Sequence, residues 1–260
     1  MNLFSKIILK ISRKLGYNIQ KIQSSEEIYM TYDDIYKKIF NQKIIIFDVG
    51  ANKGQSIERF FKNFPKAIIH CFEPVEKEFI YLKKNYGHLS NIYLNNFALG
   101  EKSTTKDFFV NAKSSTSSFN KLTKKTRWLK LRSKENKINS AFFSKRQKVK
   151  ISTADEYCKD NKINKIDILK IDTQGHEDKV LIGCKKLLKN EKISAIELEV
   201  MFDNVYDRHL TFTEVEKNLI NNNYRFAGIE TCNNNLFENI LFFGDLLYIK
   251  NGILKSHIKK

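Results

Sequence analysis

Residues 46–54 read Ile-Phe-Asp-Val-Gly-Ala-Asn-Lys-Gly, and this stretch decides the fold. An apolar run, residues 44–47, ends on an acid and a Gly-x-x-x-Gly turn, which is typical of a buried strand that enters a tight loop and then a helix. A second apolar run, residues 67–72, ends at Glu73, about 20 residues beyond the turn, where an acid suits the two hydroxyls of a ribose. The pair predicts a nucleoside-containing cofactor on a doubly wound α/β sheet.

The glycine turn favours S-adenosylmethionine over a dinucleotide. A pyrophosphate is bound by G-x-G-x-x-G, and this turn has too few glycines for that arrangement. We expect Gly50 to let the ligand lie against the backbone, Asp48 to face its ammonium directly or through water, and Glu73 to accept both ribose hydroxyls. A purely structural strand–turn–helix corner is the alternative interpretation. The other residues expected at the cofactor are Asn52 and Gly54 in the turn, and Asn96 and Ala98 beside the adenine edge.

Strands and helices alternate from residue 43 onward. Such alternation predicts a mostly parallel sheet with helices on both faces and ligands at the carboxyl ends of the strands. Residues 112–147 interrupt the pattern, because they have no clean period and are rich in Ser, Lys and Arg, as a long functional or disordered loop is. The expected strands are 43–49, 67–73, 91–95, 166–171, 193–200, 224–229 and 245–249. The expected helices are 25–41, 54–63, 76–86, 153–161, 176–189 and 212–222.

Several sequence blocks stand in order along the chain: 47–55, Phe-Glu-Pro at 72–74, Ala-Leu-Gly at 98–100, the serine cluster 114–118, 166–177, Val-Leu-Ile-Gly at 180–183 and Ile-Glu at 196–197. Together they resemble the FkbM-type methyltransferase family, within the class I S-adenosylmethionine-dependent methyltransferases. The resemblance covers roughly residues 43–249. It implies a Rossmann-like, seven-stranded sheet whose last strand is antiparallel. It also implies methyl transfer to oxygen, commonly a hydroxyl of a sugar, glycan or secondary metabolite.

An O-methyltransferase has to align the acceptor hydroxyl with the transferred methyl group, and a base can take the hydroxyl proton. The fourth core strand delivers Asp172 to the carboxyl edge of the sheet, so Asp172 is the first candidate for a base or substrate-orienting acid. His176 is the second, because histidine ordinarily titrates near neutral pH. Ser117 and Glu197 lie in blocks that carry the resemblance and are expected at the acceptor. No metal is predicted, because the spacing of Asp172, His176 and Glu177 matches no metal motif.

The net charge of +17 is concentrated in two segments. The sequence has 46 Lys and Arg against 29 Asp and Glu, and residues 113–150 hold 13 basic residues with only Glu135 as an acid. Residues 1–24 have basic residues and no acid. We interpret 113–150 as a basic flap over an anionic acceptor, with Trp128 as a stacking surface. A lysine-rich composition with a merely solvated surface is the alternative.

The expected organisation has three parts. A basic amphipathic helical segment, 1–42, precedes the methyltransferase domain 43–250 with its basic insertion 112–147, and a basic tail, 251–260, follows. Residues 1–15 could lie on an anionic membrane surface or pack on the domain, and both remain open. No stretch approaches a membrane span, no signal peptide is evident and the cysteines are widely spaced. These features predict a cytoplasmic protein, at the inner membrane surface if residues 1–15 bind lipid.

The sequence therefore favours an S-adenosylmethionine-dependent O-methyltransferase whose acceptor is a sugar, glycan or other small molecule, of anionic character. An RNA ribose O-methyltransferase that holds nucleic acid on the basic insertion is the alternative, with nucleic acid the less favoured partner. Base N-methylation is disfavoured, because such enzymes commonly carry a Pro-Pro loop and Asp172 is followed by Thr-Gln-Gly. A non-catalytic binding module of the same fold has no positive feature in its favour.

Overall fold

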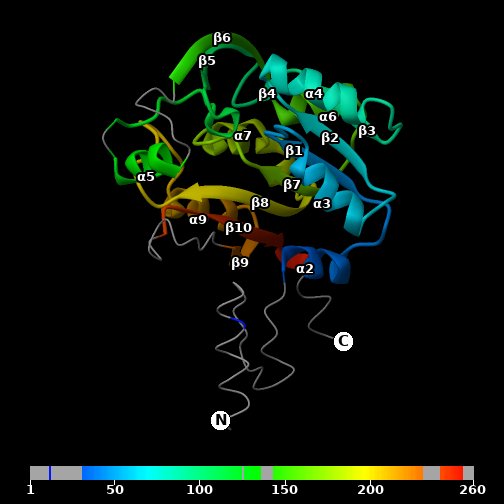
Figure 1. Ribbon diagram of the computed structural model, residues 1–260. Helices are drawn as coiled ribbons and strands as arrows, with labels where there is room; N and C mark the ends of the chain where they lie inside the picture. Colours follow the sequence, from blue (N-terminus) through cyan, green and yellow to red (C-terminus); the bar gives the residue numbers. More distant parts are fainter. Residues whose placement is uncertain (1–11, 13–30, 125, 136–142, 231–240, 254–260) are drawn as a thin grey trace.

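The computed structural model describes residues 12, 31–124, 126–135, 143–230 and 241–253 (Figure 1). The domain is built on a seven-stranded sheet of order β3-β2-β1-β7-β8-β10-β9. β10 runs antiparallel to β8 and β9, and the other neighbouring pairs are parallel, which confirms the predicted fold class. The strands are β1 (Ile45–Val49), β2 (Ile68–Phe72), β3 (Ile92–Asn95), β7 (Ile166–Ile171), β8 (Ile193–Met201), β9 (Tyr224–Glu230) and β10 (Phe243–Lys250).

Helices cover both faces of this sheet, each over its own hydrophobic core. One core joins apolar residues of β1, β2, β7 and β10 to α2 (Tyr32–Ile39), α3 (Gln55–Asn63) and α4 (Glu76–Tyr86). The other joins the opposite face to α6 (Ala154–Asp160), α7 (Glu177–Gly183), α8 (Lys185–Lys189) and α9 (Phe212–Ile220). Since the central strands are buried on both faces, they read as continuous apolar runs rather than alternating ones.

The strand order places a ligand site beside β1. The chain leaves β1 toward β2 and β3 on one side, and returns to β7 on the other side. In an open α/β sheet, the carboxyl ends of the strands at such a reversal form a crevice, because the connections that follow them diverge. The turn after β1, Glu73 after β2 and Asp172 after β7 all lie at this edge.

A second, three-stranded sheet was not predicted. Its order is β4-β6-β5, with β4 (Ala98–Leu99), β5 (Thr104–Asn111) and β6 (Phe143–Ser152), and it stands above the main sheet in Figure 1. The interruption expected over 112–147 therefore contains the 3-10 helix η1 (Ser114–Thr116), α5 (Arg127–Glu135) and the start of β6. Sequence patterns did not indicate these strands, because the sheet buries few residues of its own. Its core is a small apolar cluster that includes Phe108, Val110, Val149 and Ile151.

Two further differences concern the helices. The helix expected over 176–189 is two helices, α7 and α8, which meet at Cys184. In the segment expected as a helix over 25–41, α2 begins after Thr31, whose side chain forms a capping box with Asp34. The predicted helix over 1–15 and most of the tail 251–260 lie outside the described residues. Within the described part of the chain, no helix has the length and apolarity to cross a membrane.

Candidate active site

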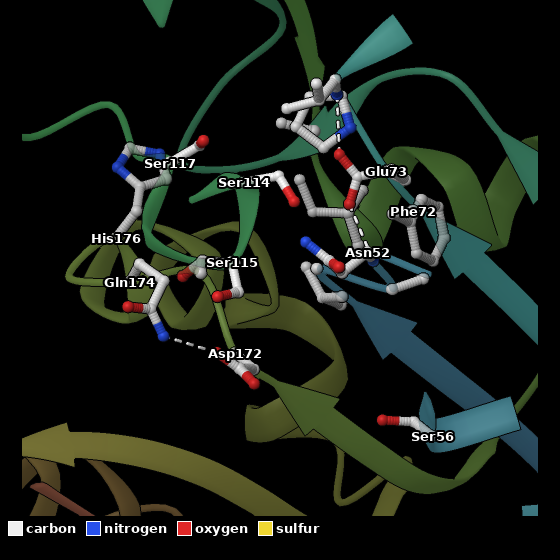
Figure 2. Close-up of a pocket in the computed structure, with 18 of the residues that line it drawn as sticks. Asn52, Ser56, Phe72, Glu73, Ser114, Ser115, Ser117, Asp172, Gln174 and His176 are labelled. Atoms are coloured by element: carbon white, nitrogen blue, oxygen red, sulfur yellow. Dashed lines mark hydrogen bonds between the residues drawn. The ribbon is translucent and has the colours of Figure 1, made fainter. Parts of the chain in front are cut away.

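A cavity of about 350 Å³ opens at the carboxyl ends of β1, β2 and β7 (Figure 2). Most of its wall comes from the turn after β1, the start of α3, the segments after β2 and β7, and the serine cluster. In Figure 2, Glu73 and Asn52 lie on one side of it, and Asp172, Gln174 and His176 on the other. The residues that line the cavity include Gly50, Asn52, Gln55, Ser56, Arg59, Glu73, Pro74, Val75, Ala98, Leu99, Phe108, Ser114, Ser115, Ser117, Phe119, Lys170, Asp172, Gln174 and His176.

Glu73 presents a fixed carboxylate to the cavity. The backbone N–H of Asn52 donates to its Oε2 over 2.8 Å, and that of Val75 donates to its Oε1 over 2.7 Å. Burial raises the pKa of Glu73 to about 7, although these two hydrogen bonds favour the ionised form. A carboxylate held in this way offers its remaining lone pairs to neighbouring hydroxyls, as predicted for a ribose.

The other residues predicted near Glu73 at the cofactor divide into two groups: those that line the cavity and one that does not. Asn52 and Ala98 line the cavity, and Asn52 has a left-handed backbone with φ 47°. Asn96 is not part of the lining: its Nδ2 donates to the backbone oxygen of Glu73 over 3.0 Å. Asn96 therefore holds the Glu73 backbone, and its place at the adenine edge stays a prediction.

Gly50 and Gly54 are required by the backbone rather than by a ligand. A Cβ on Gly50, which has φ +92°, would lie 2.0 Å from the backbone oxygen of Asp172. A Cβ on Gly54, with φ +89°, would meet the Tyr86 ring, and Gly54 does not line the cavity. Gly54 thus lies outside the cavity lining and its role at the cofactor stays a prediction, whereas Gly50 lines the cavity while it allows β1 and β7 to converge.

Asp48 is fully buried below the cavity and does not line it. Neither of its carboxylate oxygens has a hydrogen-bond partner in the described part of the chain. Burial raises the pKa of Asp48 to about 6, and the positive charge of Lys170, its neighbour in register on β7, opposes that rise. The ammonium interaction expected of Asp48, directly or through water, stays a prediction, and the carboxylate lies behind the cavity wall.

Asp172 lies at the end of β7 and reaches the cavity. Its Oδ2 is 3.3 Å from Nζ of Lys170, and its Oδ1 accepts a hydrogen bond of 2.9 Å from Nε2 of Gln174. Its side chain is 37% exposed, so one edge of the carboxylate stays accessible from the cavity. A positioned and accessible carboxylate can accept or orient a hydroxyl proton.

Sequence reasoning missed the residues that orient Asp172. Nε2 of Gln174 also donates to Oε2 of Glu199 over 2.6 Å, and Oε1 of Gln174 accepts from the Tyr206 hydroxyl over 2.8 Å. Burial, followed by the charge of Asp172, raises the pKa of Glu199 well above its usual range. Oε1 of Glu177 accepts from the backbone N–H groups of Thr173 and Gly175, which fixes the loop that carries Gln174. Gln174 and Glu177 lie in the block 166–177 and Glu199 follows the block 196–197, whereas no sequence signal marks Tyr206.

His176 lines the cavity, but its chemistry differs from the expectation. Its Nε2 is buried with no hydrogen-bond partner in the described structure, and a Cβ on Gly100 would lie 3.2 Å from it. The ring packs against Phe119, with 4.4 Å between ring centroids. Burial lowers the pKa of His176 to about 4, so the ring is neutral at neutral pH. These features disfavour His176 as the proton acceptor.

Ser117 lies in the cavity wall, as predicted, together with Ser114 and Ser115. The segment that carries them is anchored to the loop after β7: the Ser118 hydroxyl donates to the backbone oxygen of Gln174 over 2.7 Å. The Asn120 amide also donates to the backbone oxygen of Gly175. The serine cluster thus forms the part of the cavity wall beside Asp172.

Glu197 is corrected from an acceptor contact to a partner of Arg59. Nη1 and Nη2 of Arg59 donate to Oε1 and Oε2 of Glu197 over 2.8 and 2.6 Å. Burial alone would raise the pKa of Glu197, but the Arg59 guanidinium holds it below its usual value. Glu197 is buried outside the lining, whereas Arg59 is part of the lining.

Trp128 is also corrected. It is 4% exposed and belongs to a core cluster with Met201, Val205, Tyr206 and Phe242, away from the cavity lining. Trp128 therefore packs α5 against the segment after β8 and does not offer a stacking surface.

Replacement of Trp128 by alanine should lower the free energy of unfolding by about 3–5 kcal/mol, because it removes a large buried side chain. Urea denaturation of the purified variant measures this loss. Trp128→Phe, which keeps an aromatic ring, should lose less and should bind S-adenosylmethionine normally. Unchanged stability of Trp128→Ala, combined with weaker acceptor binding, would restore the stacking role.

The basic insertion lines the cavity with serines and Phe119, not with its described basic side chains. Among the described residues of 113–150, no lysine or arginine lines it. Arg146 and Lys121 lie over the Phe109 ring, at 5.5 and 5.8 Å from its centroid. Lys148 pairs with Asp107 on the neighbouring strand. Nor do the described residues contain a cluster of three or more His, Cys, Asp or Glu side chains suited to a metal ion.

The seven-stranded sheet with β10 antiparallel between β8 and β9, the reversal beside β1 and the acid after β2 are together the features of the class I methyltransferase fold. The chain belongs to the FkbM methyltransferase family, because the sequence model described as "Methyltransferase FkbM domain" matches residues 48–226. The protein is thus a methyltransferase with S-adenosylmethionine as its cofactor, as predicted.

Two known proteins illustrate the relationship. The chain is 26% identical over 176 residues to the 2-O-methyltransferase NoeI of Sinorhizobium fredii, a match that covers 68% of this chain and 70% of NoeI. It is similar in fold to the crystal structure of methyltransferase FkbM from Methylobacillus flagellatus KT, with a TM-score of 0.51 and 12% identity. That match covers 81% of this chain but only 44% of the other, so this chain corresponds to less than half of that protein.

Proposed function

We propose that this protein transfers a methyl group from S-adenosylmethionine to a hydroxyl of a neutral, polar acceptor such as a sugar or glycan. The observation that carries the proposal is Asp172, a fixed and accessible carboxylate at the end of β7, in one cavity with Glu73. The similarity to a protein named as a 2-O-methyltransferase supports oxygen as the methylated atom.

The cavity residues fit the cofactor. Glu73, which Asn52 and Val75 hold in place, is positioned for the ribose hydroxyls. The side chains of Val75, Leu99 and Phe108 give the neighbouring wall the apolar character that an adenine ring needs. When bound, S-adenosylmethionine supplies an electrophilic methyl group on a sulfonium that is itself the leaving group.

Asp172 is assigned to the acceptor hydroxyl. Lys170 and Gln174 occupy one position on each of its oxygens, which fixes the plane of the carboxylate. An acceptor hydroxyl that donates to the free edge is held in one orientation, and its proton can pass to Asp172 as the oxygen is methylated. Such general-base assistance typically contributes about 10²–10⁴-fold in rate.

The acceptor side of the cavity favours a neutral ligand. The side chains around Asp172 are the hydroxyls of Ser114, Ser115 and Ser117 and the amide of Gln174, beside a neutral His176 ring. Hydroxyls and amides hydrogen-bond to sugar hydroxyls without requiring charge. This proposal replaces the anionic acceptor expected from composition, because none of the described basic side chains of 113–150 lines the cavity.

Transfer of tritium from [methyl-³H]S-adenosylmethionine to oligosaccharides tests the proposal. The panel pairs neutral oligosaccharides with uronic-acid oligosaccharides of matched length, and includes a structured RNA. We expect transfer to neutral members, with a KM that does not change with salt, since screening has no charge to act on. Transfer confined to uronic-acid members would overturn the neutral acceptor, and transfer confined to RNA would support the ribose methyltransferase alternative.

A further inference from the structure

A row of alternating charges lies beneath one end of the cavity. Asp48, Lys170 and Glu197 are neighbours in register on β1, β7 and β8, so their side chains share one face of the sheet. Burial opposes the charge on Lys170, but Asp172, Asp48 and Glu197 around it raise its pKa above the usual value. The two acids lie behind the wall, whereas Lys170 lines the cavity.

Arg59 extends this row into the cavity from α3. Its guanidinium forms the two-pronged contact with Glu197, and its Nε is 3.4 Å from Oδ1 of Asp33. The Tyr36 hydroxyl donates to Oε2 of the same Glu197 over 2.9 Å. Asp33 and Tyr36 belong to α2, which precedes the family match at residues 48–226. The orientation of Arg59 is therefore fixed partly by a helix upstream of the matched region.

Arg59 retains hydrogen-bonding capacity toward the cavity. A guanidinium has five N–H donors, and Glu197 takes only one from each terminal nitrogen. Arg59 and Lys170 are the two cationic side chains among the described lining residues, and the polar side chains of Gln55 and Ser56 lie beside them. A planar, fixed guanidinium next to an ammonium is suited to a carboxylate.

We propose that Arg59 and Lys170 form the subsite for the carboxylate of the methionine end of S-adenosylmethionine, with Glu197 and Tyr36 as positioning residues. The inference rests on the proposed function and adds the residues that hold this end of the cofactor. Glu73 marks the ribose end of the cavity, and Arg59 belongs to α3, whose Ser56 lies apart from the serine cluster in Figure 2.

The charge balance favours the cofactor over an acidic acceptor as the source of this carboxylate. The two cations are accompanied by five acids: Asp33, Asp48, Asp172, Glu197 and Asp245. A ligand with net negative charge would be repelled by this excess of acids. The methionine end carries an ammonium beside its carboxylate, so it can interact with both signs of charge.

Calorimetric titration with two nucleosides tests the subsite. S-adenosylmethionine and decarboxylated S-adenosylmethionine differ only in the carboxylate. The wild-type protein should bind the former about 10–100-fold more tightly, as expected for one charge-assisted contact. Arg59→Gln should lose most of this preference by weakening S-adenosylmethionine alone. Arg208→Gln, which removes an exposed arginine paired with Asp178 outside the cavity, is the matched control and should keep it.

Loss of Arg59 leaves Glu197 buried without its cation, so a second variant guards against misfolding. Arg59→Gln/Glu197→Gln removes both charges together and should also lose the preference while still binding the decarboxylated nucleoside. A full preference in both variants would overturn the proposal, as would an equal loss of affinity for both nucleosides. If the preference persists and the KM of an acidic acceptor alone rises, the subsite belongs to the acceptor. A wild-type protein that binds neither nucleoside would contradict the proposed function itself.

Discussion

Asp172→Asn is expected to lower turnover by about 10²–10⁴-fold, the usual contribution of a general base. The substitution keeps the size of the side chain and removes its charge and proton affinity, so it acts on the chemical step. The affinity for S-adenosylmethionine should not fall by more than about threefold, because Asp172 is assigned to the acceptor and its loss leaves Lys170 free for the cofactor carboxylate. Single-turnover methyl transfer, with calorimetry for the cofactor, measures the two effects separately.

Asp160→Asn serves as the matched control, because Asp160 is an exposed acid at the end of α6. It should leave both turnover and cofactor affinity unchanged. If Asp172→Asn weakened cofactor binding and left turnover at saturation intact, Asp172 would be a ligand of the cofactor. The assignment of the acceptor to this side of the cavity would then fail.

Glu73→Gln is expected to weaken S-adenosylmethionine binding by about 10–100-fold. Each charge-assisted hydrogen bond to a carboxylate contributes about 1.5–3 kcal/mol, and the amide keeps only part of that strength. The substitution also places an NH₂ group opposite one of the backbone N–H groups of Asn52 and Val75, which now donate to the carboxylate. Equal affinity in the variant and the wild type would remove Glu73 from the cofactor site.

The pH dependence of binding gives an independent check on Glu73. In the free protein, burial raises its pKa to about 7, so the carboxyl is mostly protonated at lower pH. The two ribose hydroxyls need the ionised form, and affinity should therefore fall as pH is lowered through about 7, by at most about tenfold per pH unit. Glu73→Gln has no charge to lose and should show a flatter profile. Asp48, with a pKa of about 6, titrates in both proteins and cancels in the comparison.

Much of the main fold follows from local sequence. The central strands β1, β2, β7 and β8 are mostly apolar runs and are buried on both faces, so their pattern does not depend on what each packs against. The positions of Glu73 and Asp172 also follow, because a residue that ends a parallel strand must lie at the carboxyl edge. Both residues line the cavity.

The second sheet and the contact between Arg59 and Glu197 could not be predicted from the sequence, for a physical reason. β6 has an exposed, lysine-rich face and pairs with β5 across the intervening insertion, and neither strand has a long apolar run of its own. Arg59 and Glu197 are 138 residues apart in the chain, so their contact depends on the assembled fold. The error on Trp128 had another cause: its basic surroundings suggested exposure, whereas the ring is buried against residues after β8.

The central claim is methyl transfer from S-adenosylmethionine to an oxygen atom, and the product itself tests it most directly. The wild-type protein is incubated with [methyl-¹³C]S-adenosylmethionine and the neutral oligosaccharide that accepts label best, and the purified product is analysed by carbon–proton correlation NMR. We predict one labelled methyl signal with the shift of a methyl ether and a long-range correlation to a sugar-ring carbon. A labelled methyl bound to nitrogen or carbon, or no labelled oligosaccharide from a protein that binds S-adenosylmethionine, would contradict the account.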